Sequence, residues 1–423
     1  MKVRLNQKRG RLAAATALLL FLLNLAVPGM AAPWVQTTSL PDAYIAQTLV
    51  YASNYLYQAG GSSDSYGFDD GTNVFYSLVH SDGTIAAWTK TTSLPVAVID
   101  PASVAANGFV YVLAGEDFFP DNSPQGGVVI PTNTVYYAKI NSDGSLGSWS
   151  SASPLPNNLT GLGASVWNKQ IYVIGGSLAT TLSSNVYSAT IQADGSLSAW
   201  TTQAPLPVAI NTTAEAANGF LYVLGGYINN GNTIVNTVYY SKINSDGTLA
   251  GWNLTTSLPQ PESYFGAVAA NGFIFSIGGF NGTSPTSSFY ISAVKGDGSL
   301  GSWLSGTSLP LPIYFHAVAA SGSYIFFSGG TSISQDSSAV YSMALPAPLL
   351  VPTLAAGGFT NGNFQLQLAS STNTGFGLLA SPDLINWTNL GWGFTDTNGT
   401  LLFQDTNAAS FPNRFYRAYW PLP

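Results

Sequence analysis

The stretch Val238–Gly279, which begins VYYSKINSDGTLAGWNLTTSLP and ends AVAANGFIFSIGG, decides the fold of this 423-residue chain. It contains two turn pairs, Asp246-Gly247 and Asn271-Gly272, together with the tryptophan Trp252, a Leu-Pro pair and the glycine doublet Gly278-Gly279. The same signals recur in the same order along most of the chain. An internal repeat of this length is the signature of an array of similar units.

Six tryptophans mark the copies of the repeat. Each is followed seven residues later by a proline, and the intervals between successive tryptophans are 54, 61, 51, 52 and 51 residues. A glycine doublet recurs in five copies, and Ala114-Gly115 takes its place in the second copy. The six tryptophans are Trp34, Trp88, Trp149, Trp200, Trp252 and Trp303.

The local signals within one copy predict four antiparallel strands. A small apolar strand, Gly266–Ala270, precedes an Asn-Gly turn of the kind that closes hairpins, and an alternating strand, Phe273–Ile277, follows it. A variable loop then leads to a tyrosine strand, and an Asn-Ser-Asp-Gly turn leads to a tryptophan strand. Four antiparallel strands repeated radially are typical of a β-propeller.

This pattern resembles the kelch family, whose blades carry a glycine doublet at the end of the second strand, a tyrosine in the third and a tryptophan in the fourth. In one copy these are Gly225-Gly226, Tyr240 and Trp252, and the resemblance covers residues 33–345. Tyr240 and Trp252 are twelve residues apart, more than in a typical kelch repeat, because an Asn-Ser-Asp-Gly hairpin is inserted. The resemblance implies an all-β, six-bladed kelch-like β-propeller.

The two ends of the repeat region predict how the ring closes. The region enters with a tryptophan strand, Trp34–Thr38, that has no tyrosine strand before it. It leaves with a tyrosine strand, Ala339–Met343, that has no tryptophan strand after it. Pairing the two would complete a sixth blade and remove two exposed sheet edges, which otherwise invite aggregation.

Residues 1–32 have the layout of a secretory signal peptide. A basic start precedes an apolar run of about 16 residues, Leu12–Val27, and a small-residue exit follows. The run is short for a bilayer span. We therefore expect bacterial export to the periplasm, the cell surface or the medium, with no membrane span after cleavage.

The charge of the exported part excludes several partners. The first 32 residues hold five of the twelve basic residues and none of the nineteen acidic ones, so the formal charge of the remainder is near −12. Nucleic acids and anionic membranes need clustered Lys and Arg, so neither is an expected partner. The chain has no cysteine, so disulfides contribute nothing to its stability. We expect a monomer.

The remainder of the chain reads as a linker, residues 346–356, and a small β-sandwich, residues 357–423, because five short strand patterns follow one another there. The sequence SPDLINWTNLG, with PNRFYRAYWP after it, resembles a C-terminal module found on many large secreted bacterial proteins. Sorting, surface retention and carbohydrate attachment are all open roles for it. Arg414 and Arg417 are expected to pair with Asp396 or Asp405.

The connections between strands divide into two classes. The first-to-second and third-to-fourth connections are tight turns, which lie on one face of an up-and-down blade. The other connections are long and variable, and include the segments after each Leu-Pro pair. Variable loops on a rigid scaffold usually carry function. We call their side of the repeat region the long-loop face and expect the functional site there.

Candidate catalytic residues are few. The chain has two histidines, which excludes a three-histidine metal site, and His80 sits beside a tight turn. Galactose oxidase, another kelch-type propeller, would imply copper with a Cys-Tyr crosslink, which the missing cysteine excludes. The remaining candidates are Glu215, a carboxylate at an otherwise small or apolar position of an innermost strand, Glu262 on the long-loop face, and His316 near the channel mouth.

Aromatic residues on the same face suit a neutral, hydroxyl-rich ligand or a protein surface. With His316, the candidates for ligand binding are Tyr44, Phe68, Phe118, Tyr227, Tyr264 and Tyr314.

Acidic residues gather on the long loops of the first two copies. Oxygen-rich loops can hold calcium, although the spacing here is not that of the helix-loop-helix calcium motif. No cofactor is predicted, and calcium is the one that these loops could accept. The weak calcium candidates are Asp64, Asp69, Asp70, Glu116 and Asp117.

Two functions are consistent with this inventory. The first is a secreted binding or scaffold protein that holds a glycan or a protein through its long-loop face. The alternative is a carbohydrate-active enzyme, a mutarotase, epimerase or lyase on neutral or uronic sugars, which would use Glu215, Glu262 and His316. Six-bladed kelch proteins include sialic-acid mutarotases, but residues 33–345 contain no arginine to hold such a carboxylate ligand.

Overall fold

A computed structural model describes residues 32–63, 71–120, 127–230, 233–345, 353–360, 363–370 and 375–419. The described chain forms two compact units, which we call the repeat unit, residues 32–345, and the C-terminal unit, residues 353–419. The secondary structure is made of β-strands and one short 3-10 helix, η1 (Ala408–Ser410). The all-β prediction is confirmed. The predicted signal peptide lies outside the described residues, apart from Ala32.

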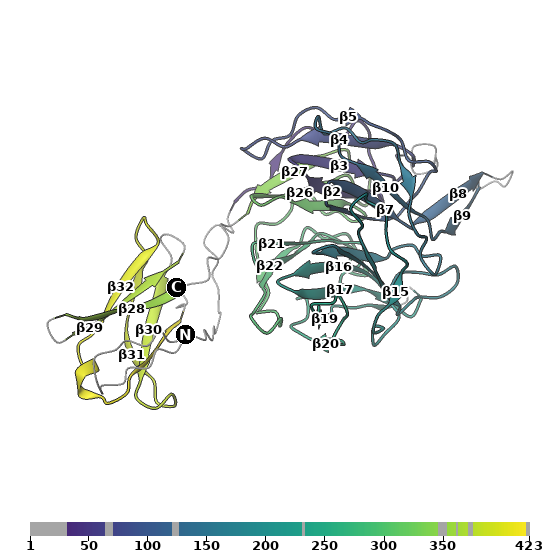
Figure 1. The fold of residues 1–423 in the computed structure, drawn as a ribbon. Coiled ribbons are helices and arrows are strands. Elements are labelled where there is room, and N and C mark those ends of the chain that lie inside the picture. Colours follow the sequence, from purple (N-terminus) through teal and green to yellow (C-terminus); the bar gives the residue numbers. More distant parts are fainter. Residues whose placement is uncertain are drawn as a thin grey trace. The chain divides into compact units, whose positions relative to one another are not determined.

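The repeat unit contains six antiparallel sheets whose strands follow the order in which the sequence analysis expected them (Figure 1). The sixth sheet has the order β1-β27-β26-β25, so the first strand of the unit pairs with the last. The first sheet contains β2 (Thr48–Ala52), β3 (Tyr55–Ala59), β4 (Val74–Leu78) and β5 (Thr89–Lys90), and the second contains β6 (Ala102–Ala106), β7 (Phe109–Leu113), β10 (Val135–Lys139) and β11 (Ser150–Ser151). The third contains β12 (Gly163–Trp167), β13 (Gln170–Ile174), β14 (Val186–Thr190) and β15 (Thr201–Thr202), and the fourth contains β16 (Asn211–Ala217), β17 (Phe220–Ile228), β19 (Val238–Lys242) and β20 (Asn253–Leu254), with β18 (Thr233–Ile234) paired to β17. The fifth contains β21 (Gly266–Ala270), β22 (Phe273–Ile277), β23 (Phe289–Ala293) and β24 (Leu304–Ser305), and the sixth contains β25 (Ala317–Ala320), β26 (Tyr324–Ser328), β27 (Val340–Ala344) and β1 (Val35–Gln36).

The turns explain why each copy folds into a meander. Asn271 and Gly272 both have positive φ, 53° and 85°, as a two-residue hairpin turn requires. In the other tight turn, the Asp246 side chain accepts hydrogen bonds from the backbone N–H and the hydroxyl of Thr248 at 3.0 and 2.7 Å. The same arrangement recurs in the other Asp-Gly turns. These aspartates therefore stabilise turns.

The first strands of the six sheets contact one another in a closed order. β2 lies against β6, β6 against β12, β12 against β16, β16 against β21, β21 against β25, and β25 against β2. Buried apolar clusters fill the spaces between successive sheets, for example Tyr172 and Ile174 of the third sheet with Leu221 and Val223 of the fourth. Each sheet is thus buried on both faces by its two neighbours.

The tryptophans join the outer strands in the same cyclic order. The indole N–H of each one donates a hydrogen bond to a backbone carbonyl just after the outer strand of the preceding sheet. The cycle closes at Trp34, which bonds to Thr307 at 3.0 Å. These bonds satisfy the indole donor in each copy, in part-buried positions at Trp34, Trp200 and Trp252. The pairs are Trp34 with Thr307, Trp88 with Thr38, Trp149 with Thr92, Trp200 with Ser153, Trp252 with Ala204, and Trp303 with Thr256.

The glycine doublets allow neighbouring backbones to approach closely. At Gly278, with φ of 58°, an added Cβ would lie 2.8 Å from the Ile313 carbonyl oxygen of the next sheet. At Gly279 it would lie 3.0 Å from the carbonyl oxygen of Ser263. Only glycine combines positive φ with room for these contacts. Glycine at both positions therefore permits this close packing, although the second copy holds Ala114, with φ of 55°, at the first position.

A two-stranded ribbon, β8 (Glu116–Pro120) with β9 (Gly127–Pro131), extends from the second sheet (Figure 1). The ribbon begins directly after Gly115 and ends four residues before β10. The ribbon begins with an isolated bridge between Ile99 and Glu116, whose backbones bond at 2.9 and 2.7 Å. The long connection of the second copy is therefore ordered at its base, beside the segment that enters β6.

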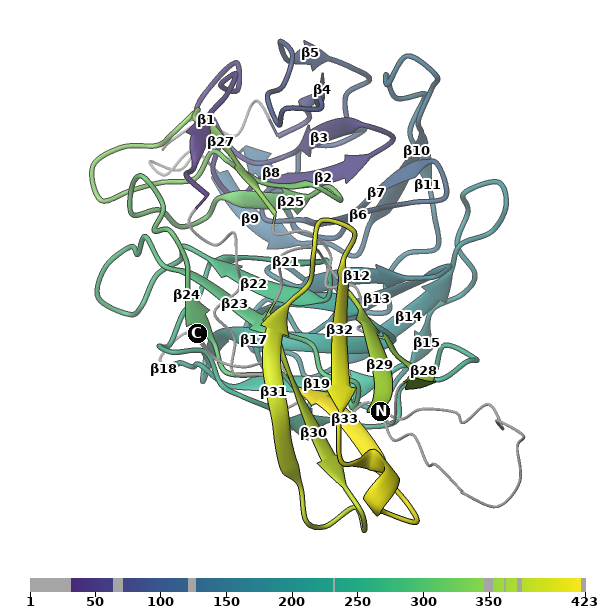
Figure 2. The ribbon, with the colours of Figure 1, turned by 90° about the vertical axis from the view of Figure 1, so that its left-hand side faces the viewer.

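The C-terminal unit consists of two three-stranded antiparallel sheets, in the orders β28-β29-β32 and β31-β30-β33 (Figure 2). Their apolar side chains form one core, which includes Leu354, Leu366, Phe376 and Tyr416. Residues 353–356, which the sequence analysis placed in the linker, belong to β28, because Leu354 is buried opposite Leu368. The strands are β28 (Thr353–Thr360), β29 (Asn363–Ala369), β30 (Gly375–Ser381), β31 (Thr388–Phe394), β32 (Thr400–Asp405) and β33 (Phe415–Tyr419).

Arg414 pairs with Asp405, one of the two partners expected for it. Its Nε lies 2.7 Å from the Asp405 carboxylate, and both side chains are buried. Arg417 instead stacks on the Trp387 ring, 4.5 Å from its centroid. Both arginines therefore serve the C-terminal unit's own packing.

In the described residues, no helix is long and apolar enough to cross a membrane.

Candidate functional site

Five residues that precede the first strands form a belt at one end of the repeat unit, which we call the mouth ring: Ala46, Asp100, Gly161, Tyr264 and Phe315. All five have positive φ, between 50° and 56°. Backbone N–H groups join them across neighbouring sheets, from Phe315 to Tyr264, Ala46 to Phe315, Asp100 to Ala46 and Gly161 to Asp100, at 3.0, 3.0, 2.9 and 3.5 Å. The ring belongs to the predicted long-loop face.

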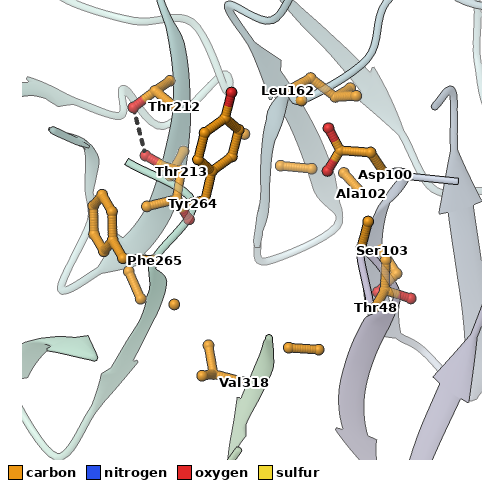
Figure 3. A pocket seen from close by; sticks show the side chains of 18 of the residues that line it. Thr48, Asp100, Ala102, Ser103, Leu162, Thr212, Thr213, Tyr264, Phe265 and Val318 are labelled. Carbon is orange, nitrogen blue, oxygen red and sulfur yellow. Dashed lines mark hydrogen bonds between the residues drawn. The ribbon is translucent and has the colours of Figure 1, made fainter. Parts of the chain in front are cut away.

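The backbone of the mouth ring is strained. A left-handed conformation costs a residue with a side chain about 1–2 kcal/mol, and four of the five members are not glycine. Such strain concentrates at functional sites, where the surrounding structure imposes it. With this backbone conformation, the side chains of Asp100 and Tyr264 point toward the cavity that the ring encloses, as Figure 3 shows.

The fourth sheet departs from this pattern. A β-bulge between Asn211 and Thr213 inserts Thr212 into the start of β16. Thr212 donates its hydroxyl to the Leu224 carbonyl at 2.8 Å, and the Asn211 amide reaches back to Ser177 at 3.2 Å. The Asn211 side chain also covers Gly161, where a Cβ would overlap its amide. Asn211 therefore takes the place of a sixth ring member.

Two adjoining cavities open inside and above the ring. The channel cavity, of about 200 Å³, is lined by the starts of all six first strands (Figure 3). The mouth cavity, of about 440 Å³, is lined by residues that include Glu116, Thr160, Ser177 and Tyr227. The two share Ala46, Asp100, Asn211, Tyr264 and Phe315. The size of the mouth cavity lies within the range of small-molecule sites, about 300–1,000 Å³.

Asp100 is the residue that both cavities present and that the sequence analysis missed. Burial, and next the nearby Glu116 carboxylate, raise the pKa of Asp100 to about 7, while a hydrogen bond from Thr160 at 3.4 Å opposes the shift. Burial also raises the pKa of Glu116. The bridge between Ile99 and Glu116 brings these two carboxyl groups together. They form an acid pair on one wall of the mouth cavity.

Two predicted aromatic residues face this acid pair across the mouth cavity. The rings of Tyr227 and Tyr264 have centroids 5.5 Å apart, and Tyr264 also packs against Phe315 at 4.1 Å. Burial raises the pKa of Tyr264, and so do Tyr227 and the two acids. The Tyr227 hydroxyl lies 3.3 Å from that of Ser177. The wall therefore offers ring faces together with hydroxyl groups.

The other predicted aromatic ligands lie elsewhere. Tyr44 is only 1% exposed and packs on Phe75, so its ring belongs to the core between the first and sixth sheets. Tyr314 stacks with Phe280 and Phe315 beside the ring. Phe68 lies outside the described residues, as does the side chain of Phe118.

Glu215 projects from β16 into the channel cavity, as its sequence position predicted. Its side chain is surrounded by protein on most sides and yet keeps partial contact with the channel. Burial raises the pKa of Glu215 to about 8, and a backbone N–H from Ala269 offsets part of the rise. With this pKa, Glu215 is mostly protonated near neutral pH. It lines the channel cavity and is not among the residues that line the mouth cavity.

Glu262 is buried away from both cavities and is held by three side chains. One carboxylate oxygen accepts from Gln260 at 2.9 Å and from Ser288, and the other accepts from Ser276 at 2.9 Å. Its side chain is fully buried, and burial raises its pKa against these bonds. This carboxylate links the connection before β21 to the fifth sheet, so the structure gives it a positioning role in the fold.

His316, just before β25, is one of the residues that line the channel cavity, and it is largely buried between the fifth and sixth sheets. Its ring stands edge-on to Phe327 and lies close to Gly278. Burial lowers the pKa of His316 to about 4, and the nearby Ile277 backbone offsets part of the shift without a well-formed hydrogen bond. Neither ring nitrogen has a hydrogen-bond partner among the described residues. The neutral imidazole therefore packs between Gly278 of the fifth sheet and Phe327 of the sixth.

The acidic residues proposed for calcium are only partly described. Glu116 lines the mouth cavity and Asp117 follows it on β8, whereas Asp64, Asp69 and Asp70 lie outside the described residues. Within the described ranges, no group of three or more His, Asp or Glu side chains is arranged to hold a metal ion. The calcium site stays a prediction.

Glu215→Gln is expected to change how stability depends on pH. Because the folded-state pKa is about 8 and the unfolded value about 4.5, the folded protein retains a proton that the unfolded chain has lost between these pH values. The stability that the folded protein has with Glu215 protonated is therefore fully present below about pH 4.5. It is lost as the pH rises from there through 8, by up to about 1.4 kcal/mol of unfolding free energy per pH unit.

Urea denaturation of both proteins between pH 5 and pH 8.5 measures the effect. We expect the wild-type protein to lose stability relative to Glu215→Gln as the pH rises, and the comparison removes the parallel slope of Asp100. A difference that stays constant over this range would show that Glu215 is ionised in the folded channel.

The comparisons with known proteins support the fold. No protein-family model matches this chain, and no curated protein sequence matches it either. Among solved structures, that of YjhT is similar, with 14% sequence identity, a TM-score of 0.57, and an alignment that covers 73% of this chain and 96% of YjhT. At this identity the likeness concerns the fold alone, and it shows that the repeat architecture is shared with a known structure.

Proposed function

We propose that residues 33–345 form a six-bladed β-propeller of the kelch type, closed by the N-terminal strand and followed by a small β-sandwich. The cyclic order of the first strands supports this, as do the cyclic tryptophan bonds and the pairing of β1 with β27. The likeness to YjhT agrees with a shared fold. The propeller would then carry its long connections, and the mouth ring, at one end of its central channel.

The proposed function is that of a secreted, monomeric glycan-binding protein, with the mouth cavity as its site. The observation that carries it is the cavity itself, in which Tyr227 and Tyr264 offer ring faces beside the oxygens of Thr160, Ser177 and Asn211. Apolar ring faces with a few convergent polar groups are typical of sites for hydroxyl-rich ligands. A concave site of this size favours a glycan over the flat surface of a protein partner.

Tyr227→Ala is expected to weaken glycan binding at least tenfold, because it removes one ring of the wall and the hydroxyl that faces Ser177. The exported protein is first screened on a glycan array, and the affinity of both proteins for the best ligand is then measured by calorimetry. Tyr51→Ala is the matched control, because Tyr51 lies at the tight-turn end of β2. Equal losses in the two variants, or no glycan bound at all, would contradict the proposal.

A second function, catalysis on sugars, is favoured by one observation. Asp100 and Glu116 form an acid pair opposite Tyr264, and the pKa of Asp100, about 7, suits a general acid or base near neutral pH. The activities to assay are those of a mutarotase, an epimerase or a lyase. Loss of turnover in Asp100→Asn with retained ligand binding would support an enzyme.

A further inference from the structure

The carboxyl groups of the two cavities have no cationic partner. Glu116 and Asp100 line the mouth cavity, and Asp100 and Glu215 line the channel cavity. The repeat unit contains no arginine, and its five lysines are Lys90, Lys139, Lys169, Lys242 and Lys295.

None of these lysines is among the described lining residues. Lys139 and Lys242 end β10 and β19 beside the tight turns, Lys169 and Lys295 lie in or next to such turns, and Lys90 is on an outer strand. Burial and the nearby Glu116 raise the pKa of Asp100 to about 7, so this carboxyl is partly protonated near neutral pH in the absence of a cation. A cation bound at the mouth would favour its ionised form, and the lysines of the repeat unit do not supply one there.

A second observation concerns a neutral group. Gln47, which is only 6% exposed, lines the channel cavity next to the mouth ring. Its amide nitrogen donates to the Ser328 carbonyl at 2.8 Å, but its Oε1 has no hydrogen-bond partner among the described residues. Gln47 thus leaves one acceptor without a donor in the wall of the channel cavity, and His316, which lines the same cavity, leaves both ring nitrogens without partners among the described residues.

The walls also suit a cation. Tyr227, Tyr264 and Phe315 present aromatic rings to the mouth cavity, with centroid separations of 5.5 and 4.1 Å between successive rings. A positive charge over such a face is attracted by the ring quadrupole. Carboxylates on one wall and rings on the other enclose a volume of about 440 Å³. The hydroxyls of Thr160 and Ser177 stand between them to meet sugar hydroxyls.

We propose that the mouth cavity binds an amino sugar, with the ammonium group of the sugar held by Asp100 and Glu116 and its ring placed against Tyr227 and Tyr264. The inference rests on the proposed glycan-binding function and names the class of glycan. A sugar whose amine is acetylated lacks the charge, so an unmodified hexosamine binds more tightly than its N-acetyl form or a neutral hexose.

Binding should be linked to protonation. The titratable groups around Asp100 are Glu116 on β8, Tyr227 on β17 and Tyr264 before β21. Glu215 and His316 line the channel cavity with it, and burial lowers the pKa of His316 to about 4, so that imidazole is neutral over this pH range. An ammonium ligand favours the ionised form of Asp100, so its affinity rises between pH 5.5 and 7.5 and binding releases a proton. A neutral sugar that accepts a hydrogen bond from the protonated carboxyl shows the opposite dependence.

The test is calorimetry on the full exported protein with glucosamine, N-acetylglucosamine, glucose and a lysine derivative with a blocked α-amine, in buffers of different ionisation enthalpy. We expect glucosamine to bind at least about tenfold more tightly than the two uncharged sugars, with proton release. Asp100→Asn and Glu116→Gln are each expected to remove most of that preference for glucosamine over glucose. Asparagine tolerates positive φ, so Asp100→Asn preserves the mouth ring. Asp42→Asn, at an exposed carboxylate of the same unit, is the control.

The outcomes separate the two proposals. Equal affinity for glucosamine and glucose would overturn the amino-sugar inference and leave glycan binding intact. Equal binding of the lysine derivative and glucosamine would overturn it in favour of a protein ligand. Failure of all three sugars to bind would contradict the glycan-binding function itself.

Discussion

Gly226→Ala is expected to lower the free energy of unfolding of the repeat unit by about 4 kcal/mol or more. The residue has φ of 97°, which alone costs alanine about 1–2 kcal/mol. An added Cβ would in addition overlap the Asn211 carbonyl oxygen and lie 3.1 Å from the Thr212 Cα, both in the backbone of β16. Backbone cannot move aside as a flexible side chain can, so the loss falls in the exceptional range for a point mutation.

Gly219→Ala provides the matched control in the same sheet. Gly219 has φ of 83°, but no atom would lie within 4 Å of an added Cβ. The control thus carries the cost of the backbone conformation without the overlap, and about 1–2 kcal/mol is expected. Urea denaturation followed by tryptophan fluorescence measures both variants. Similar losses at the two positions would mean that Gly226 is required for its φ angle alone.

Asp405→Ala is expected to destabilise the C-terminal unit by about 3–5 kcal/mol, because it leaves a buried guanidinium without its carboxylate. The Asp405 carboxylate receives Arg414 at 2.7 Å, the Tyr416 hydroxyl at 3.1 Å and the Asn407 backbone N–H at 3.0 Å. Arg414 also stacks over Phe411, at 4.1 Å from the ring centroid, and is only 4% exposed. It has little freedom to reach water.

The double variant Asp405→Leu with Arg414→Met tests the reason for this loss. It removes both charges, so no unpaired ion stays buried, and we expect it to be more stable than Asp405→Ala. Calorimetric unfolding of residues 33–423 measures each protein. A double variant less stable than Asp405→Ala would show that the ion pair itself, rather than the penalty of an unpaired arginine, stabilises this unit.

The regular parts of the repeat unit could be predicted from the sequence because their chemistry is local. An Asn-Gly pair such as Asn271-Gly272 fixes a hairpin by its φ angles, and the predicted strands on either side, Gly266–Ala270 and Phe273–Ile277, have those bounds in the structure. The expected pairing of the Trp34 strand with the last sheet is also present, because each open edge lacked one partner. The recurrence of similar signals in six copies supported the assignment of each one.

The site was harder to predict because it depends on contacts between copies. Asp100 occupies a ring position that also holds Ala46, Gly161, Tyr264 and Phe315, so no residue type marks it. Its partner Glu116 reaches it only through the bridge at Ile99. A sequence signal existed, since Asp100 precedes Pro101 where the chain enters an inner strand.

The roles of two candidates could not be read from sequence position either. Glu262 meets Gln260, Ser276 and Ser288, two of which come from separate strands or loops, so its burial depends on the assembled sheet. His316 has an apolar environment that Gly278 and Phe327 of two different sheets create. Glu215, in contrast, was predictable from the two-residue period of β16, which sets the side that faces the channel.

The most direct test of the central claim, that the mouth cavity is the ligand site, is a crystal structure of residues 33–423 soaked with the glycan that binds best in solution. We expect sugar density between the Tyr227 and Tyr264 rings and the Asp100 carboxylate, above the channel cavity. Density confined to the tight-turn end of the repeat unit or to the C-terminal unit, with the mouth cavity free of sugar, would contradict the claim.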